Sequence, residues 1–230
     1  LDGLLREMKG FVVIDTETTS LDPFSAEIVG MSFSWAQGQA AYVPWSEEAK
    51  AKLKPMLEDP SRPKGAQNAK FDMQVLRTNG IDVRGLAFDT MVASYLLDPG
   101  RGVHNLDALA FRYLNVKKTP TEELIGKGAN AISMMDVPEE KVARYAAEDA
   151  DVTFRLAEVF RPELEKDGLM PLFGEVEMPL VLVLLDMERA GVRVDSDYLK
   201  RLSREFEDLA HKVEREIREI AGEEVNLNSP

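Results

Sequence analysis

Asp15 and Glu17 are the first residues whose types and spacing point to chemistry, because they follow the apolar, β-branched run 11–14 directly. Side chains alternate along a strand, so the two carboxylates are expected on one face. The apolar run predicts that this strand is buried and central in its sheet. Two close acids at a buried strand end need a cation, whereas the same pair also occurs at solvated loop entrances.

Asp72 is a second candidate, near the start of a predicted helix. It lies three and four positions before Val75 and Leu76, and this spacing puts its carboxylate on the core-facing side of the helix. An unpaired charge is costly there. Asn68 precedes this helix, and Asn is a favoured N-cap residue, so a capping role and a ligand-binding role are both open for it.

Tyr145 and Asp149 are four positions apart and are therefore neighbours on one face of a third predicted helix. Asp149 shares its face with apolar residues such as Val152, whereas Glu148 shares a face with charged residues and is expected to be solvated. Asp149 is thus the better metal ligand. A lone Tyr-x-x-x-Asp is common in ordinary helices, so the pair needs support from elsewhere.

Composition limits the kind of metal site and the cellular setting. The 230 residues include no cysteine and two histidines, so a bound metal must use oxygen ligands. The net charge of −13 argues against binding nucleic acid simply by neutralising its backbone, but metal ions held by carboxylates would meet a phosphate.

The longest apolar runs are too short for a membrane span, and the sequence predicts a cytoplasmic protein without a membrane partner.

Hydrophobic periodicity predicts strands first and helices later, which is typical of a layered α/β fold. A long charged helix and a polar stretch at 226–230 then indicate a different, incomplete unit. Strands are expected at 11–14, 27–35 and 39–44, as a meander, and helices at 47–57, 69–79, 89–97, 105–113, 139–165, 175–189 and 196–221, with short apolar links that could hold further strands.

The three acidic groups occur together and in a fixed order: Asp-x-Glu, then Asn-x-x-x-Asp, then Tyr-x-x-x-Asp. In this combination the chain resembles the DEDD superfamily of 3′→5′ exonucleases, in the variant with tyrosine in the third motif. The wider sequence resembles the exonuclease region of family A DNA polymerases of the polymerase I type. Its most specific segments are 103–110 and 145–153, and 177–180, 188–192 and 226–230 are similar to the opening of that family's polymerase region.

This resemblance implies an RNase H-like mixed sheet flanked by helices, with an exonuclease domain at 1–165 and the first helices of a truncated polymerase domain at 166–230. It implies proofreading hydrolysis of single-stranded or frayed DNA 3′ ends, release of a nucleoside monophosphate, and a connection to the remainder of a polymerase chain. Two alternatives stay open: a free-standing exoribonuclease of the RNase D type, and a non-catalytic module that supports a polymerase or binds DNA.

The resemblance also implies a two-metal-ion site for Mg²⁺ or Mn²⁺. Asp15 would bridge both ions, Glu17 and Asp149 would complete the first site, and Asp72 would hold the second. Tyr145, an ordinary phenol with a pKa near 10, would orient the attacking water.

Contacts to the DNA strand are implied for residues around the first two motifs, with Leu21 as a wedge between the last bases or as a simple packing residue. His104 is expected to be structural. Two departures stand out: Phe71 replaces a tyrosine of some relatives, and Thr121 replaces an aromatic that would stack on a base, a contribution of roughly 1–3 kcal/mol. The implied strand contacts are Thr18, Leu21, Gln67 and Asn68.

Overall fold

The computed structural model describes residues 1–100, 102–128, 131–222 and 226–227. The described chain forms two compact units, Leu1–Arg189 and Ala190–Pro230. Part of the segment predicted to open a polymerase region, 228–230, lies outside the described residues.

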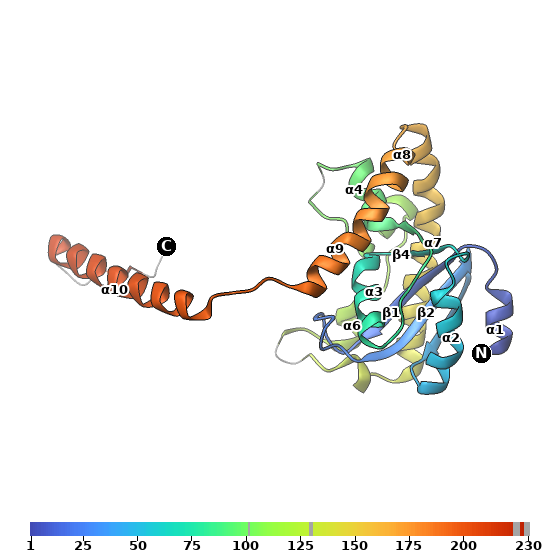
Figure 1. Cartoon of the computed structure of the whole chain (residues 1–230), viewed down its shortest axis with the longest axis horizontal. Coiled ribbons are helices and arrows are strands. Elements are labelled where there is room, and N and C mark those ends of the chain that lie inside the picture. Colours follow the sequence, from blue (N-terminus) through green and yellow to red (C-terminus); the bar gives the residue numbers. More distant parts are fainter. Residues whose placement is uncertain (101, 129–130, 223–225, 228–230) are drawn as a thin grey trace. The chain divides into compact units, whose positions relative to one another are not determined.

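One five-stranded mixed sheet, in the order β3-β2-β1-β4-β5, forms the centre of the first unit (Figure 1). β1 (Val12–Thr18) pairs antiparallel with β2 (Ile28–Ala36), and β2 pairs antiparallel with β3 (Gln39–Pro44), so the predicted meander is confirmed. On its other edge β1 runs parallel to β4 (Lys64–Ala66), which runs parallel to β5 (Leu86–Asp89). β1 is therefore central, as its sequence predicts.

The predicted helices are present with two changes. The segment expected as one helix over 105–113 divides into a short α-helix and a π-helical turn, and the helix expected from 175 begins with another π-helical turn. The helical elements are α1 (Asp2–Glu7), α2 (Glu47–Glu58), α3 (Ala69–Thr78), α4 (Thr90–Leu97), α5 (Leu106–Leu109), η1 (Ala110–Leu114), α6 (Thr121–Ile125), η3 (Met134–Asp136), α7 (Glu139–Lys166), α8 (Met170–Leu172), η4 (Phe173–Glu177), α9 (Met178–Ala190) and α10 (Ser196–Ala221).

Alternation along β1 divides the core between the two faces of the sheet. Val12 and Ile14 are buried in a cluster with apolar side chains of α2 and α3. Val13 instead packs with Ala150 and Phe154 of α7, which lies across β1, β2 and β3 (Figure 1). Because successive side chains point to opposite faces, each residue after Ile14 is directed either towards α3 or towards α7.

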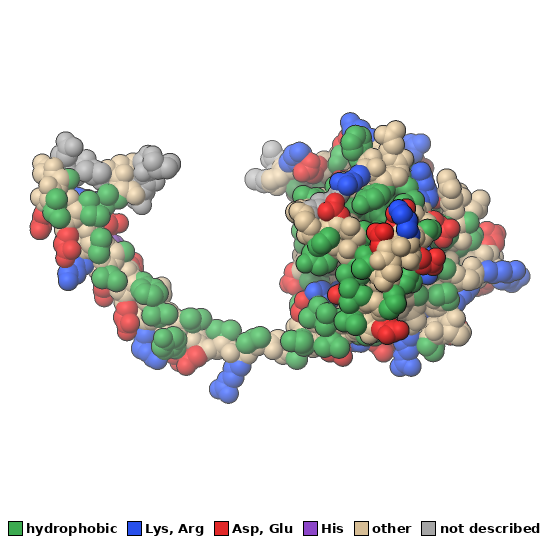
Figure 2. Space-filling model, turned by 90° about the horizontal axis from the view of Figure 1, so that it is seen from above, with side chains coloured by type: hydrophobic (Ala, Val, Ile, Leu, Met, Phe, Trp, Pro, Cys, Tyr) green, Lys and Arg blue, Asp and Glu red, His purple; other side chains and the backbone are tan. Residues whose placement is uncertain are grey.

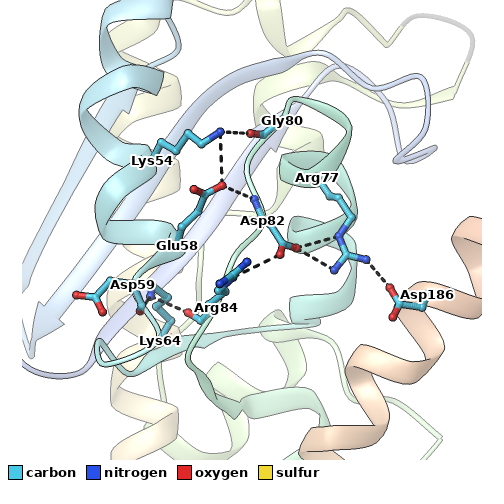
Figure 3. Close-up of polar contacts among 9 residues, drawn as sticks. All are labelled: Lys54, Glu58, Asp59, Lys64, Arg77, Gly80, Asp82, Arg84 and Asp186. Carbon is cyan, nitrogen blue, oxygen red and sulfur yellow. Dashed lines mark hydrogen bonds and ion pairs between the residues drawn. The ribbon is translucent and has the colours of Figure 1, made fainter.

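A polar network ties α9 to α3 on the surface of the first unit. The guanidinium of Arg77 on α3 contacts Asp82 at 2.9 Å and Asp186 of α9 at 2.5 Å (Figure 3). Beneath these charges, the fully buried Leu185 of α9 enters the core cluster that includes Leu76. Compact packing in the first unit thus continues to Arg189. The division at residue 165, between an exonuclease domain and a polymerase region, stays a prediction.

In the second unit, α10 has the predicted bounds and begins where Asp195 accepts a hydrogen bond from the backbone N–H of Tyr198 (2.9 Å). None of the described side chains of this helix is buried. Figure 2 shows hydrophobic side chains gathered along this segment, and the exposed ones at helical spacing are Leu199, Phe206, Leu209, Val213 and Ile217. The helix is therefore amphipathic, with these apolar residues gathered on one face.

No single described helix is long and apolar enough to cross a membrane. The helices Glu139–Lys166 and Met170–Ala190 have that length and composition only when taken together, and the chain bends by 119° between them.

Candidate active site

The predicted site residues meet in one pocket of about 280 Å³ at the end of β1. Three elements supply its chemistry: β1 with the loop that follows it, the start of α3, and the middle of α7. The pocket is lined by every residue that the sequence singled out for catalysis or strand binding, namely Asp15, Glu17, Thr18, Leu21, Gln67, Asn68, Asp72, Tyr145 and Asp149, together with Phe71, Thr121 and several apolar side chains.

Asp15 and Glu17 lie on the same side of β1 as Val13, so they are directed towards α7. Ser32, the register partner of Asp15 on β2, donates a long hydrogen bond of 3.4 Å to the Asp15 carboxylate. Burial, and then the charge of Asp149, raises the pKa of Glu17 to about 8. Burial and the neighbouring carboxylates of Asp72, Glu17 and Asp149 also raise the pKa of Asp15 well above its ordinary value. These acids are held in a site that favours a bound cation or a proton.

Asp72 approaches from the opposite face of the sheet, in the first turn of α3, and is buried. Its Oδ1 accepts hydrogen bonds from the backbone N–H of Thr16 (3.0 Å) and from the Thr16 hydroxyl (2.6 Å). Burial raises the pKa of Asp72 to about 7 in spite of these two bonds. Thr16, between the two acids of β1, thus holds the third acid, a role that the sequence did not reveal.

The start of α3 corrects the capping role considered for Asn68. Asn68 occupies the N-cap position in a left-handed conformation (φ 61°), and its side chain makes no capping hydrogen bond. The carboxylate of Asp89, at the end of β5, accepts the backbone N–H groups of Asn68 (3.2 Å) and Ala69 (2.7 Å) instead. Since Asp89 already supplies the acceptor, the Asn68 side chain is not required as a cap.

Asp149 projects from α7 into the pocket and is buried, as its helix face predicts. Both of its carboxylate oxygens accept hydrogen bonds from the Lys118 ammonium, at 2.6 and 2.9 Å. Burial raises the pKa of Asp149 to about 6, although the charge of Lys118 lowers it. The sequence gives no sign that Lys118 is buried at the site, because nothing in its neighbourhood along the chain distinguishes it from the exposed Lys117.

Glu148, expected to be solvated, is half-buried and accepts the backbone N–H of Thr119 at 3.0 Å. That bond anchors the loop that carries Lys118. The expectation was wrong because the loop before α6 folds over this part of α7 and covers it.

Tyr145 lies one turn before Asp149, and its hydroxyl is 2.6 Å from the Thr121 hydroxyl. Burial, and then the charge of Asp149, raises the pKa of Tyr145 above its ordinary value. The phenol is therefore neutral at pH 7 and can donate or accept a hydrogen bond but cannot act as a ready base. Thr121, noted for its missing aromatic ring, contacts the residue expected to orient water.

The residues implied in strand binding differ in how free their side chains are. Leu21 is 92% exposed at the pocket, as a wedge would be. The Thr18 hydroxyl donates to the carbonyl of Ser20 (2.9 Å). Gln67 is engaged within the protein, since its Nε2 donates to the His104 carbonyl (2.9 Å) and its Oε1 accepts from Thr90.

The oxygen-only donor set, four buried or half-buried carboxylates with raised pKa values, fits hard divalent cations such as Mg²⁺ or Mn²⁺. Among the described residues, however, no three Asp, Glu, His or Cys side chains are gathered closely enough to form a finished metal site. Two of the carboxylates are turned towards protein donors: Asp72 to Thr16, and Asp149 to Lys118. The donor types fit such ions. Both bonds to Asp72 end on its Oδ1, whereas both oxygens of Asp149 are bonded to Lys118.

Comparison with known families assigns the class. The 3′-5′ exonuclease family of A-type DNA polymerases matches residues 3–165, and the chain belongs to this family. Along its whole length it is also similar to bacterial DNA polymerase I. It is 40% identical to DNA polymerase I of Pseudomonas aeruginosa over 246 residues, covering 100% of this chain and 27% of the relative, and 42% identical to that of Chloroflexus aurantiacus, covering 98% and 25%. The chain thus spans about a quarter of the length of these relatives.

Solved structures confirm the RNase H-like α/β fold. The polymerase domain of Pol1 from M. smegmatis, in complex with a DNA primer-template and dNTP, matches 100% of this chain and 37% of its own, with a TM-score of 0.80 and 26% identity. Brucella melitensis NrnC matches 84% of this chain and 93% of its own, with a TM-score of 0.68 and 23% identity, a likeness that concerns the fold.

Proposed function

We propose that this chain is the proofreading region of a DNA polymerase I and hydrolyses single-stranded or frayed DNA from the 3′ end with two divalent ions, Mg²⁺ or Mn²⁺. The observation that carries the proposal is the convergence of Asp15, Glu17, Asp72 and Asp149, with Tyr145, on one pocket in a chain of the exonuclease family. A related fold, NrnC of Brucella melitensis, is known with bound Mg²⁺, which supports the use of such an ion here.

In this proposal Asp15, Glu17, Asp72 and Asp149 would hold the metals through their carboxylate oxygens. When bound, two such ions activate a water and stabilise the leaving oxygen of a phosphodiester. The neutral phenol of Tyr145 orients the attacking water by a hydrogen bond, and Thr121 fixes the direction of that phenol.

The strand end is held by Thr18, Asn68 and the exposed Leu21, which separates the last bases. Gln67 forms part of the pocket wall, and both ends of its amide are bound to protein groups. In this proposal the strand contacts Gln67 where it lines the pocket. A mismatched terminus melts at a lower cost than a paired one, so fraying and not base reading selects the substrate. The product is a nucleoside monophosphate.

The proposal includes the setting of the domain. Residues 1–165 form the exonuclease domain, and 166–230 begin the polymerase region of a longer cytoplasmic chain. The exposed apolar face of α10 supports a contact with the remainder of that chain, because such a face is normally covered.

A 5′-labelled single DNA strand tests the proposal. The purified chain with Mg²⁺ should produce a ladder that shortens from the 3′ end, excess EDTA should stop it, and Asp15→Asn should be inactive under the same conditions. A duplex with a terminal mismatch should be shortened faster than its fully paired equivalent. Equal or faster degradation of an RNA strand of the same sequence would favour the RNase D type. Full activity in EDTA, or shortening from the 5′ end, would contradict the proposal.

A further inference from the structure

Lys118 is a buried cation among the acids of the site. Its side chain is 2% exposed, and its ammonium contacts Asp149 at 2.6 Å and lies 4.3 Å from the centre of the Tyr145 ring. A buried ammonium is stable only when it is paired, and here the pairing uses both oxygens of a carboxylate assigned to metal binding.

The same ammonium has a second carboxylate within reach. Asp107, on α5, lies 3.3 Å from the Lys118 nitrogen and has a side chain that is 54% exposed. The backbone carbonyl of Thr119 is also close, at 3.2 Å. The ammonium thus contacts both carboxylates at once, so Lys118 can leave Asp149 and keep Asp107 as its ionic partner.

The loop that carries Lys118 is anchored on both sides of it. Asn115, in a left-handed conformation (φ 52°), ends η1, and the backbone N–H of Thr119 is bound to Glu148. Because the loop is fixed to α7, the ammonium remains beside the pocket whichever carboxylate it contacts. This argues for a change of partner by the side chain and against departure of the whole loop.

We propose that Lys118 is a positioning residue that bonds to both Asp149 and Asp107 in the metal-free protein and keeps only Asp107 when a divalent ion takes Asp149. The proposal rests on the proposed function, since it needs Asp149 to be a metal ligand. Lys118 then stabilises the metal-free site, which otherwise holds four carboxylates, and it competes with the incoming ion.

The proposal predicts opposite effects for two substitutions. Lys118→Met removes the competitor and should tighten Mn²⁺ binding by roughly tenfold, a change of the size found for groups adjoining metal ligands. It should also lower the melting temperature in EDTA, because the carboxylates lose their cation. Asp107→Asn removes the other partner of the ammonium, so it should weaken Mn²⁺ binding by about fivefold, the lower end of typical coupling between sites.

Calorimetric titration of Mn²⁺ into each protein, with melting curves in EDTA, decides the matter. The matched control is Lys117→Met, the same change at the exposed neighbouring residue, which should behave like wild type. Unchanged or weaker binding by Lys118→Met overturns the proposal, and so does tighter binding by Asp107→Asn. Because Asp107 is half-exposed, its variant tests the transfer even if Lys118→Met does not fold. Failure of the wild type to bind Mn²⁺ would overturn both this proposal and the proposed function.

Discussion

The hydroxyl of Thr121 lies 2.6 Å from the phenolic oxygen of Tyr145, and this contact links the first residue of α6 to the middle of α7. A phenol that rotates freely about its C–O bond can direct its proton anywhere on a cone. One fixed partner reduces that freedom, so that the remaining hydrogen-bonding capacity of the phenol is directed into the pocket. At this position a small hydroxyl residue thus contacts the phenol directly.

Thr121→Val should therefore lower the rate of strand shortening while leaving Mn²⁺ affinity unchanged. The change keeps the shape of the side chain but removes the hydroxyl, at a cost of about 1 kcal/mol in Tyr145 orientation, which is roughly fivefold in rate. Single-turnover degradation of a labelled strand and calorimetric titration measure the two quantities. Loss of metal affinity would show that Thr121 acts on the carboxylates instead.

Tyr145→Phe and Asp149→Ala separate the group that orients water from a group that binds metal. Tyr145→Phe should retain Mn²⁺ binding and lose roughly 100-fold in rate, the lower range for a positioned group that handles the reacting water. Asp149→Ala should weaken binding and rate together. If Tyr145→Phe lost metal as severely as Asp149→Ala in the same titration, the assigned roles would be wrong.

The raised pKa values of the site acids predict how the stability of the metal-free protein depends on pH. The folded-state pKa values of Glu17, Asp72 and Asp149 are about 8, 7 and 6, all above the ordinary 4.5 or 3.8. Between about pH 4 and pH 8 the folded protein binds more protons at these groups than the unfolded chain does, so these groups make stability fall as pH rises.

Melting curves in EDTA from pH 5 to pH 8.5 should show this fall, and Glu17→Gln should reduce its slope because the highest of these three pKa values is removed. Metal binding requires the ionised carboxylates, so Mn²⁺ affinity should rise over the same interval. A metal-free melting temperature that increases steadily from pH 5 to pH 8 in the wild type would contradict the assigned pKa directions.

Asp15→Asn should behave unlike most substitutions of a site residue. Asp15 is surrounded by three other carboxylates and receives one long protein hydrogen bond, so removing its charge should leave the EDTA-treated protein as stable as wild type or more so. The wild type should gain about 2.7 kcal/mol from metal at a hundredfold excess over Kd, and the variant should lose most of this gain. A variant clearly less stable than wild type in EDTA would show that protein donors hold Asp15.

Where the sequence pattern was strong, the structure followed it. The bounds of α10 and β3 were predicted from periodicity and turn residues, and the burial of Asp149 followed from its apolar helix face. β4 and β5 were not assigned, because three or four residues are too few for an alternating pattern, and because β4 begins with Lys64, which is buried by hydrogen bonds to three backbone carbonyls.

The residues that sequence reasoning missed all depend on partners far along the chain. Lys118 is buried by its contact with Asp149, Thr16 gains its role from Asp72, and Asp89 replaces the expected cap at Asn68. Each pairing joins separate elements of the fold. Local periodicity carries no information on such contacts, which only the assembled sheet and helices create.

Leu185 has a consequence for which part of the chain can fold by itself. It is fully buried in the core of the first unit, well beyond residue 165, where the match to the exonuclease family ends. A chain cut at 165 would leave the place of Leu185 empty, and an empty site of that kind costs about 2–5 kcal/mol. Trypsin should instead reach Arg193, in the exposed irregular stretch 191–195, and leave a resistant piece that includes α9. The piece that resists trypsin should therefore be longer than the region that defines the family.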